Sequence, residues 1–176
     1  NSFIAGFALM LALAAVSYRS YVRKREDNLL IEKQKLLVEQ KNKEITQSLN
    51  YARHIQAAVL PNHSNINTLL KNYFILYLPK DIVSGDFYSV LQNNGRVIVA
   101  AADCTGHGVA GAFMSMIGIS LLNRIVKANV NDSLGSILKK LDKAMCDVFS
   151  SSGNDGESDG MELAIVKITA NTIEFG

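Results

Sequence analysis

Residues 97–108, VIVAAADCTGHG, decide how the globular part of this chain folds. The run VIVAAA is apolar and bounded by turn-forming residues, which predicts a buried β-strand over 97–102. The preceding Asn93-Asn94-Gly95 predicts a hairpin turn. A strand this apolar should not hold a charge, so we expect Asp103 just beyond its end. The glycines that follow let the backbone turn sharply there and expose carbonyl oxygens.

Further strands and helices are predicted around this run. YFILYL at 73–78 and MELAIVKI at 161–168 are short apolar stretches typical of buried strands. Residues 111–126 and 134–149 have helical spacing of apolar side chains. Residues 150–160 form a Ser/Gly/Asp-rich segment, which predicts an exposed loop. The sequence after Pro61 is therefore typical of a globular domain with helices and strands.

A long helix is predicted before this domain. From Glu26 to Val59 the chain is rich in Lys, Glu, Gln and Asn and has no Pro or Gly. Apolar residues recur at intervals of seven, but the second row of a coiled coil is mostly polar. We expect a weak parallel homodimer through the helix 26–60, with a solvated single helix packed on its own domain as the alternative. The heptad positions are Ile31, Val38, Ile45, Ala52 and Val59.

The N-terminal segment Phe3–Tyr18 contains no charged residue, which predicts a membrane-spanning helix within residues 1–22. Cations follow it instead of preceding it, which argues against a signal peptide and places the later chain in the cytoplasm. We therefore expect an inner-membrane protein of three parts: 1–22, a signalling helix over 23–60 and a globular part over 61–176. A buried core helix is the alternative for the first part. Both ends of the chain are expected to be truncations.

Composition excludes several classes of protein. The chain has 176 residues, 18 Lys+Arg against 16 Asp+Glu and a net charge of +2, with no strongly basic patch outside the one after the first apolar run. Nucleic-acid binding is therefore not expected. Cys104 and Cys146 are the two cysteines, so no disulfide scaffold is predicted and a reducing compartment is the natural setting.

Two short clusters carry the candidate chemistry. One is Ser84-Gly85-Asp86-Phe87-Tyr88 and the other is residues 103–108, and each places a carboxylate beside a glycine or at a strand end. Mg²⁺ and Mn²⁺ take oxygen ligands, so Asp86, Asp103 and a nearby backbone carbonyl form a plausible half of a divalent-cation site. The alternative is that each aspartate caps a turn or helix.

Other catalytic mechanisms would need residues that the sequence lacks. A cysteine phosphatase loop starting at Cys104 would need an arginine at the position that Ala110 occupies. No glycine-lysine pair of a phosphate-binding loop occurs, and only His107 and Cys104 lie close enough in sequence to suggest zinc. His54 has no acidic neighbour and no accompanying nucleotide-binding motif, which disfavours a kinase phosphoacceptor.

Three motifs together resemble a known family. HIQAAVLP at 54–61, LPKDIVSGDFY at 78–88 and AAADCTGHGVAGAFMSMIG at 100–118 closely resemble the SpoIIE-like branch of the metal-dependent (PPM-type) serine/threonine protein phosphatases. The resemblance covers residues 54–176, and the order and spacing of the motifs are more specific than any one of them. It implies an α+β fold, an α-β-β-α sandwich of two antiparallel sheets between helices, here truncated.

The resemblance also implies roles for individual residues. The aspartates of the two motifs would bind a two-metal centre of Mn²⁺ or Mg²⁺, which assigns Asp86, Asp103 and the backbone carbonyl of Cys104 as metal ligands. An auxiliary acid that many members carry after the Phe-Tyr pair is replaced here by Ser89 and Val90, which makes that ligand missing or unnecessary.

The remaining metal-binding aspartates of the family come from later motifs, beyond Gly176. Asp159 superficially resembles one of them but comes too early in the family's order, so we interpret it as a loop residue. We therefore expect residues 1–176 alone to be inactive.

The expected activity is hydrolysis of phosphoserine or phosphothreonine on a protein, by water held between two divalent cations. His107 could donate a proton to the leaving oxygen but is expected rather to shape its loop. The resemblance implies bacterial membrane-linked signalling with a phosphoprotein partner such as an anti-sigma-factor antagonist. The alternative is a non-catalytic phosphatase-like module that relays a signal.

Overall fold

The computed structural model describes residues 2–129, 131–150 and 160–176. The chain divides into two compact units, residues 1–47 and 48–176, which are described separately. A single helix, α1 (Ser2–Val59), provides the first unit and begins the second. It ends just before Pro61, as the sequence predicts.

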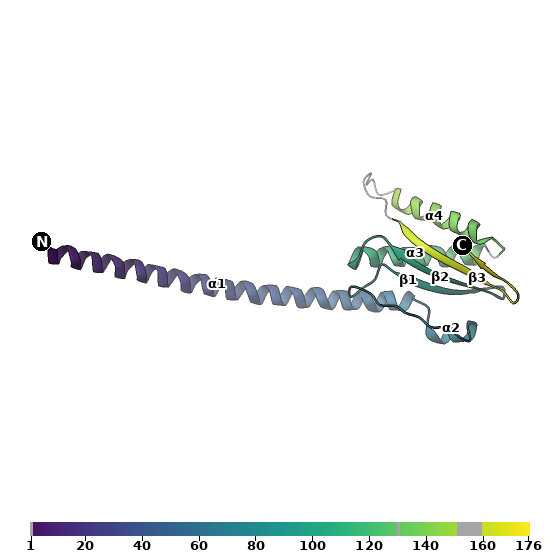
Figure 1. Ribbon diagram of the computed structural model, residues 1–176, viewed down its shortest axis with the longest axis horizontal. Coiled ribbons are helices and arrows are strands. Elements are labelled where there is room, and N and C mark those ends of the chain that lie inside the picture. Colours follow the sequence, from purple (N-terminus) through teal and green to yellow (C-terminus); the bar gives the residue numbers. More distant parts are fainter. Residues whose placement is uncertain (1, 130, 151–159) are drawn as a thin grey trace. The chain divides into compact units, whose positions relative to one another are not determined.

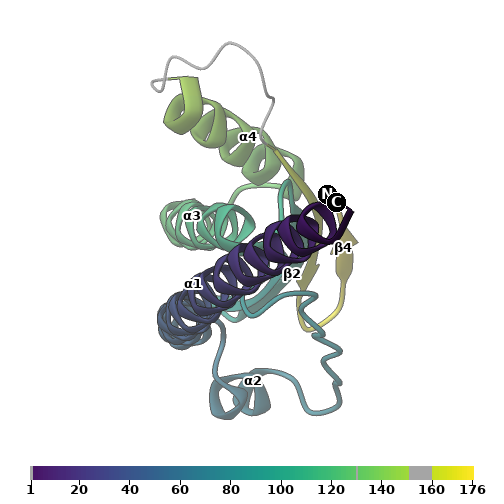
Figure 2. The ribbon, with the colours of Figure 1, turned by 90° about the vertical axis from the view of Figure 1, so that its left-hand side faces the viewer.

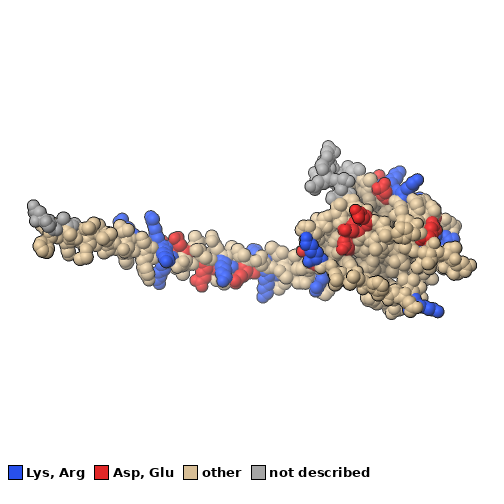
Figure 3. Space-filling model, viewed as in Figure 1, with Lys and Arg blue, Asp and Glu red and all other residues tan. Residues whose placement is uncertain are grey.

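Side chains of the first unit are exposed wherever the structure describes them. Near its start they are apolar, and Phe3 is 95% exposed. Further along, Lys and Arg alternate with Asp and Glu (Figure 3), and Lys41 and Gln40 both contact Glu44 one turn away. Nothing within this unit covers the apolar residues, so the predicted membrane span and helix pairing remain predictions.

The globular unit is built on one antiparallel sheet. Its strands are β1 (Phe87–Asn93), β2 (Arg96–Cys104), β3 (Met161–Ile168) and β4 (Ile173–Phe175), in the order β1-β2-β3-β4. Asn94 and Gly95 join β1 to β2 with positive φ angles of 48° and 74°. Those angles suit the tight hairpin that an Asn-Gly pair favours. This confirms the predicted hairpin and the α+β class.

One face of the sheet is covered by α3 (Gly108–Ala128) and α4 (Leu134–Ser150). The two helices lie side by side, with α3 against β1 and β2 and α4 against β3 (Figures 1 and 2). Burial alternates along the strands because successive side chains point to opposite faces. The core between helices and sheet includes Phe87, Ile98, Ala100, Met114, Leu122, Ile137, Leu141 and Ile165.

Among the described residues, α3 is the helix that is long and apolar enough to cross a membrane. Its apolarity has another cause here, because 56% of its most apolar window is buried inside the protein. Leu122 and Ile119 are almost fully buried in the core. In the globular unit α3 is therefore the central packing helix of the core.

Residues 73–78 lie near the opposite face of the sheet, and the prediction made for them was wrong. Residues 73–78 were expected as a buried strand, yet they form no regular strand and leave Phe74 90% and Leu76 78% exposed. No strand among the described residues pairs with this segment, and a β-strand needs such a partner for its backbone groups. The short helix α2 (His63–Leu69), capped by the Asn62 side chain, was not predicted.

Two boundaries also differ. The strand expected over 97–102 continues to Cys104, so Asp103 lies inside β2. It is tolerated there because its side chain points to the open face of the sheet, while Ala102 and Cys104 on either side point into the core. The helix expected from 111 begins earlier, at Gly108. Most of the loop predicted over 150–160, including Asp159, lies outside the described residues.

Candidate metal centre

Two carboxylates meet at one end of the sheet. Phe87 pairs with Ala102 across β1 and β2, so the same register, one residue further, sets Asp86 opposite Asp103. Both residues are exposed. Partial shielding from water, a hydrogen bond with the Asp103 carboxyl and the charge of Asp103 together raise the pKa of Asp86. The raised pKa of Asp86 reflects partial burial as well as the closeness of the second carboxyl group.

Close backbone contacts place the Cys104 carbonyl next to this pair. A Cβ atom on Gly85 would lie 3.2 Å from the Cys104 oxygen and 2.9 Å from the Gly106 oxygen. A Cβ atom on Gly111 would lie 2.5 Å from the Gly106 oxygen. Only glycine fits where three backbone segments approach this closely. The loop before Asp86, the loop after Asp103 and the first turn of α3 are therefore held together without side chains between them.

The turn after Asp103 also depends on glycine. Gly106 and Gly108 have positive φ angles of 87° and 62°, a region that other residues adopt with strain. Thr105 closes the turn on its other side, where its backbone N–H donates to the Gly160 oxygen at 3.0 Å. The DCTGHG stretch is thus a tight turn that leads directly from β2 into α3.

Gln56, near the C-terminal end of α1, supports the loop that carries Asp86. It is buried, its Oε1 accepts from the Ser84 backbone N–H at 3.0 Å, and its Nε2 donates to the Ser84 oxygen at 2.6 Å. Nε2 also donates to Ser115 Oγ on α3 at 2.9 Å. The Ser84 hydroxyl oxygen accepts from the Asp86 N–H at 3.0 Å. Gln56 lies within the HIQAAVLP motif, but the motif alone did not indicate that its side chain supports the loop before Asp86.

A cleft of about 610 Å³ opens beside the carboxylate pair, between the uncovered sheet face and residues 66–78. Tyr77 stands at its wall, where its hydroxyl donates to the Asp86 backbone oxygen at 3.2 Å. Its ring meets that of Tyr88 edge-on, with centroids 5.6 Å apart. Burial raises the pKa of Tyr77, with the charge of Asp86 adding to the shift. The cleft therefore presents carboxylates on a largely apolar and aromatic wall.

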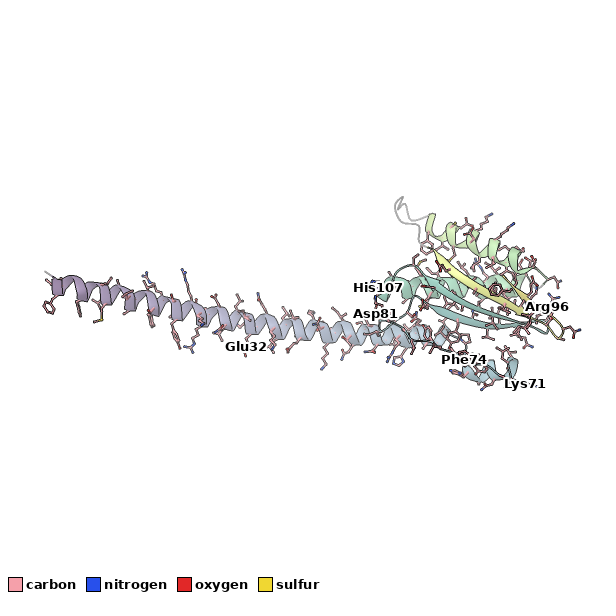
Figure 4. All side chains as sticks on the ribbon, in the orientation of Figure 1. Glu32, Lys71, Phe74, Asp81, Arg96 and His107 are labelled. Atoms are coloured by element: carbon pink, nitrogen blue, oxygen red, sulfur yellow. The ribbon has the colours of Figure 1, made fainter. Side chains whose placement is uncertain are left out.

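Cys104 and His107 have supporting positions. The Cys104 thiol points into the core, and burial, followed by the charges of Asp103 and Asp86, raises its pKa to about 11. A thiol with this pKa stays protonated near neutrality and is a poor nucleophile. His107 lies at the N-terminal end of α3, where its Nδ1 is 3.2 Å from Asp81 Oδ2 (Figure 4). This contact joins the loop before Asp86 to the loop after Asp103.

The donor set fits a hard divalent cation. Two adjacent carboxylates repel each other when both are ionised, and a cation between them removes that repulsion. The carbonyl oxygen of Cys104 adds a neutral oxygen donor nearby. Within the described ranges no group of three or more His, Cys, Asp or Glu side chains has metal-binding spacing. Asp86 and Asp103 are thus brought together as predicted, and their role as ligands remains a prediction.

Comparisons with known proteins agree with this arrangement. Residues 93–173 match the family described as Stage II sporulation protein E (SpoIIE). The SiaA-PP2C domain of Pseudomonas aeruginosa is a similar solved structure, with 33% sequence identity and a TM-score of 0.63 over 72% of this chain. None of the curated protein sequences matches the chain.

The two matches support a fragment of a SpoIIE-like PPM-type phosphatase, which confirms the resemblance inferred from the motifs. The chain spans about half the length of the SiaA-PP2C domain, since the match covers 49% of that structure. Phosphatases of this family generally use Mn²⁺ or Mg²⁺.

Proposed function

We propose that this protein hydrolyses phosphoserine or phosphothreonine on a protein partner in a reaction that depends on Mn²⁺ or Mg²⁺. The observation that best supports the proposal is that Asp86 and Asp103 lie close together on a SpoIIE-like fold. The raised pKa of Asp86 reflects partial burial together with this closeness. Two like charges on neighbouring strands weaken a sheet. The pair of Asp86 and Asp103 therefore does not serve to stabilise the fold.

The residues have distinct tasks in this proposal. When bound, two divalent ions would supply a water of lowered pKa and stabilise the charges of phosphoryl transfer. Asp86, Asp103 and the Cys104 carbonyl would hold the ions, so the aspartates act as ligands and not as acids or bases. The two hydrogen bonds between Gln56 and Ser84 would hold the loop that positions Asp86.

We also propose that the phosphatase works at the inner membrane in a signalling pathway. The apolar, exposed side chains at the start of α1 support a membrane anchor, and the four cations after them support a cytoplasmic phosphatase domain. An anti-sigma-factor antagonist is the proposed class of phosphoprotein substrate. The heptad positions of α1 support a homodimer.

The decisive test is turnover by the full-length protein. We expect hydrolysis of a phosphoserine or phosphothreonine protein substrate in the presence of Mn²⁺, with complete loss on adding EDTA and recovery when Mn²⁺ is restored. Phosphate release in steady state measures it. A protein that binds Mn²⁺ and still shows no turnover on any phosphoprotein would contradict the proposal and favour the non-catalytic relay.

A second prediction concerns the helix before the domain. Each residue inserted before Ile45 rotates the following helix by about 100° relative to the preceding part, whereas seven residues nearly restore the heptad register. If paired helices transmit a signal, phosphatase activity of the full-length protein will vary with insertion length and return near wild type at seven. Equal activity for insertions of one to seven residues would show that the helix is only a tether.

A further inference from the structure

A third carboxylate lies in line with Asp86 and Asp103. Glu162 on β3 is the direct cross-strand partner of Asp103 on β2. Asp86 falls opposite Asp103 on the other side, one step beyond the pairing of Phe87 with Ala102. Directly paired residues of antiparallel strands point to the same face of a sheet. Three acidic side chains therefore form one row at this end of the sheet, from Asp86 just before β1 to Asp103 on β2 and Glu162 on β3.

Burial of the neighbouring residues supports this placement. Asp103 and Glu162 are both exposed, while Ala102, Cys104 and Ile165 point into the core on the opposite face. All three acids of the row line the same cleft of about 610 Å³. Glu162 thus faces the space beside the candidate metal centre and not the packed side of the sheet.

No structural task explains an acid at this position. In the part of the chain that the structure describes, Glu162 has neither a hydrogen bond nor an ion pair. The contrast with Glu174 on the neighbouring strand β4 is clear, because Glu174 pairs with Lys167 and also accepts from the Leu134 N–H. An acid directly opposite another acid lowers the stability of a strand pair. Glu162 therefore lowers the stability of the metal-free sheet, and a nearby cation would offset that cost.

We infer that Glu162 is a positioning residue of the metal centre, one that acts through metal-bound water. This inference rests on the proposed function and adds a residue to the same site. Among the described residues, no three carboxylates are spaced to bind one ion directly. Glu162 would therefore contact the water bound to the ion, and not the ion itself. Mg²⁺ and Mn²⁺ keep several waters in protein sites, and a carboxylate beside them accepts hydrogen bonds from those waters and orients them.

The test compares Glu162→Gln with Asp142→Asn in the full-length protein. Both changes convert a carboxylate to an amide of the same size, but Asp142 lies exposed on α4, which covers the opposite face of the sheet. Mn²⁺ affinity is measured from the electron paramagnetic resonance signal of free Mn²⁺. We expect Glu162→Gln to weaken binding about tenfold, as loss of an outer-shell partner does, and Asp142→Asn to leave it unchanged.

A second readout needs no metal. In EDTA, Glu162→Gln removes the like-charge pair with Asp103 and should raise the thermal midpoint by about 1–3 °C. Glu162→Ala should weaken Mn²⁺ binding at least as much, which guards against a compensating amide contact. A residue with only a structural role would not raise the metal-free midpoint and lower metal affinity together.

The outcomes separate the inference from the function on which it rests. Mn²⁺ affinity of Glu162→Gln within twofold of wild type, while Asp103→Asn has lost binding, would overturn the inference and leave the metal centre intact. Failure of the wild-type protein to bind Mn²⁺ at all would overturn both.

Discussion

Asp103→Asn is expected to reduce Mn²⁺-dependent phosphatase activity of the full-length protein to background. The amide keeps the size of the side chain but removes one negative charge from the oxygen shell of the ion. The loss should exceed the 10- to 100-fold typical of residues one layer further out. Steady-state phosphate release measures the effect, and circular dichroism checks the fold.

The structure predicts that this variant folds normally. Asp103 is exposed on the open face of β2. Burial is the main cause of the raised pKa of Asp86, and the change also removes the contribution of the Asp103 charge to it. Asp142→Asn on α4 is the matched control, with the same chemical change and no expected effect. Near-normal activity of Asp103→Asn, with normal ellipticity, would remove Asp103 from the metal site.

Gly111→Ala is expected to destabilise the globular unit by about 1–3 kcal/mol and to abolish metal binding. The added Cβ would lie 2.5 Å from the Gly106 oxygen and 3.0 Å from the Gly85 Cα. All of these contacts are with backbone, so no side chain can rotate away. Relief requires the loops before Asp86 and after Asp103 to separate, which moves both carboxylates.

Gly135→Ala on α4 provides the control for this change. It is the same substitution in a helix, but among the described residues no atom outside its chain neighbours and its own helix backbone lies within 4 Å of the added Cβ. Since alanine favours helix more than glycine does, Gly135→Ala should be neutral or slightly stabilising. Thermal unfolding and Mn²⁺ binding distinguish the two variants. Equal stability and equal affinity for both would show that the contact at Gly111 does not position the site.

Local signals in the sequence were sufficient for the hairpin, the two core helices and the two candidate ligands. Asn94-Gly95 determines its turn by backbone preference alone, and Asp103 stands out because it interrupts an apolar run. The family motifs then gave the likeness that the comparisons confirm.

What could not be predicted depends on contacts between distant segments. The run at 73–78 has the composition of a strand but finds no strand to pair with among the described residues. Gln56 matters because it reaches Ser84, 28 residues later. Glu162 lies beside Asp103 because of the register between β2 and β3. The pattern of residues within either strand does not specify that register.

The apolar character of α3 affects how the protein must be made. A helix of 21 residues with the length and composition of a membrane span exposes a largely apolar surface until the protein core buries it. If residues 3–18 are inserted into the membrane during synthesis, α3 leaves the ribosome close to the insertion machinery. The sheet that covers it is completed only when β3 and β4 emerge, at residues 161–175. Correct topology then depends on α3 staying out of the bilayer until its covering strands arrive.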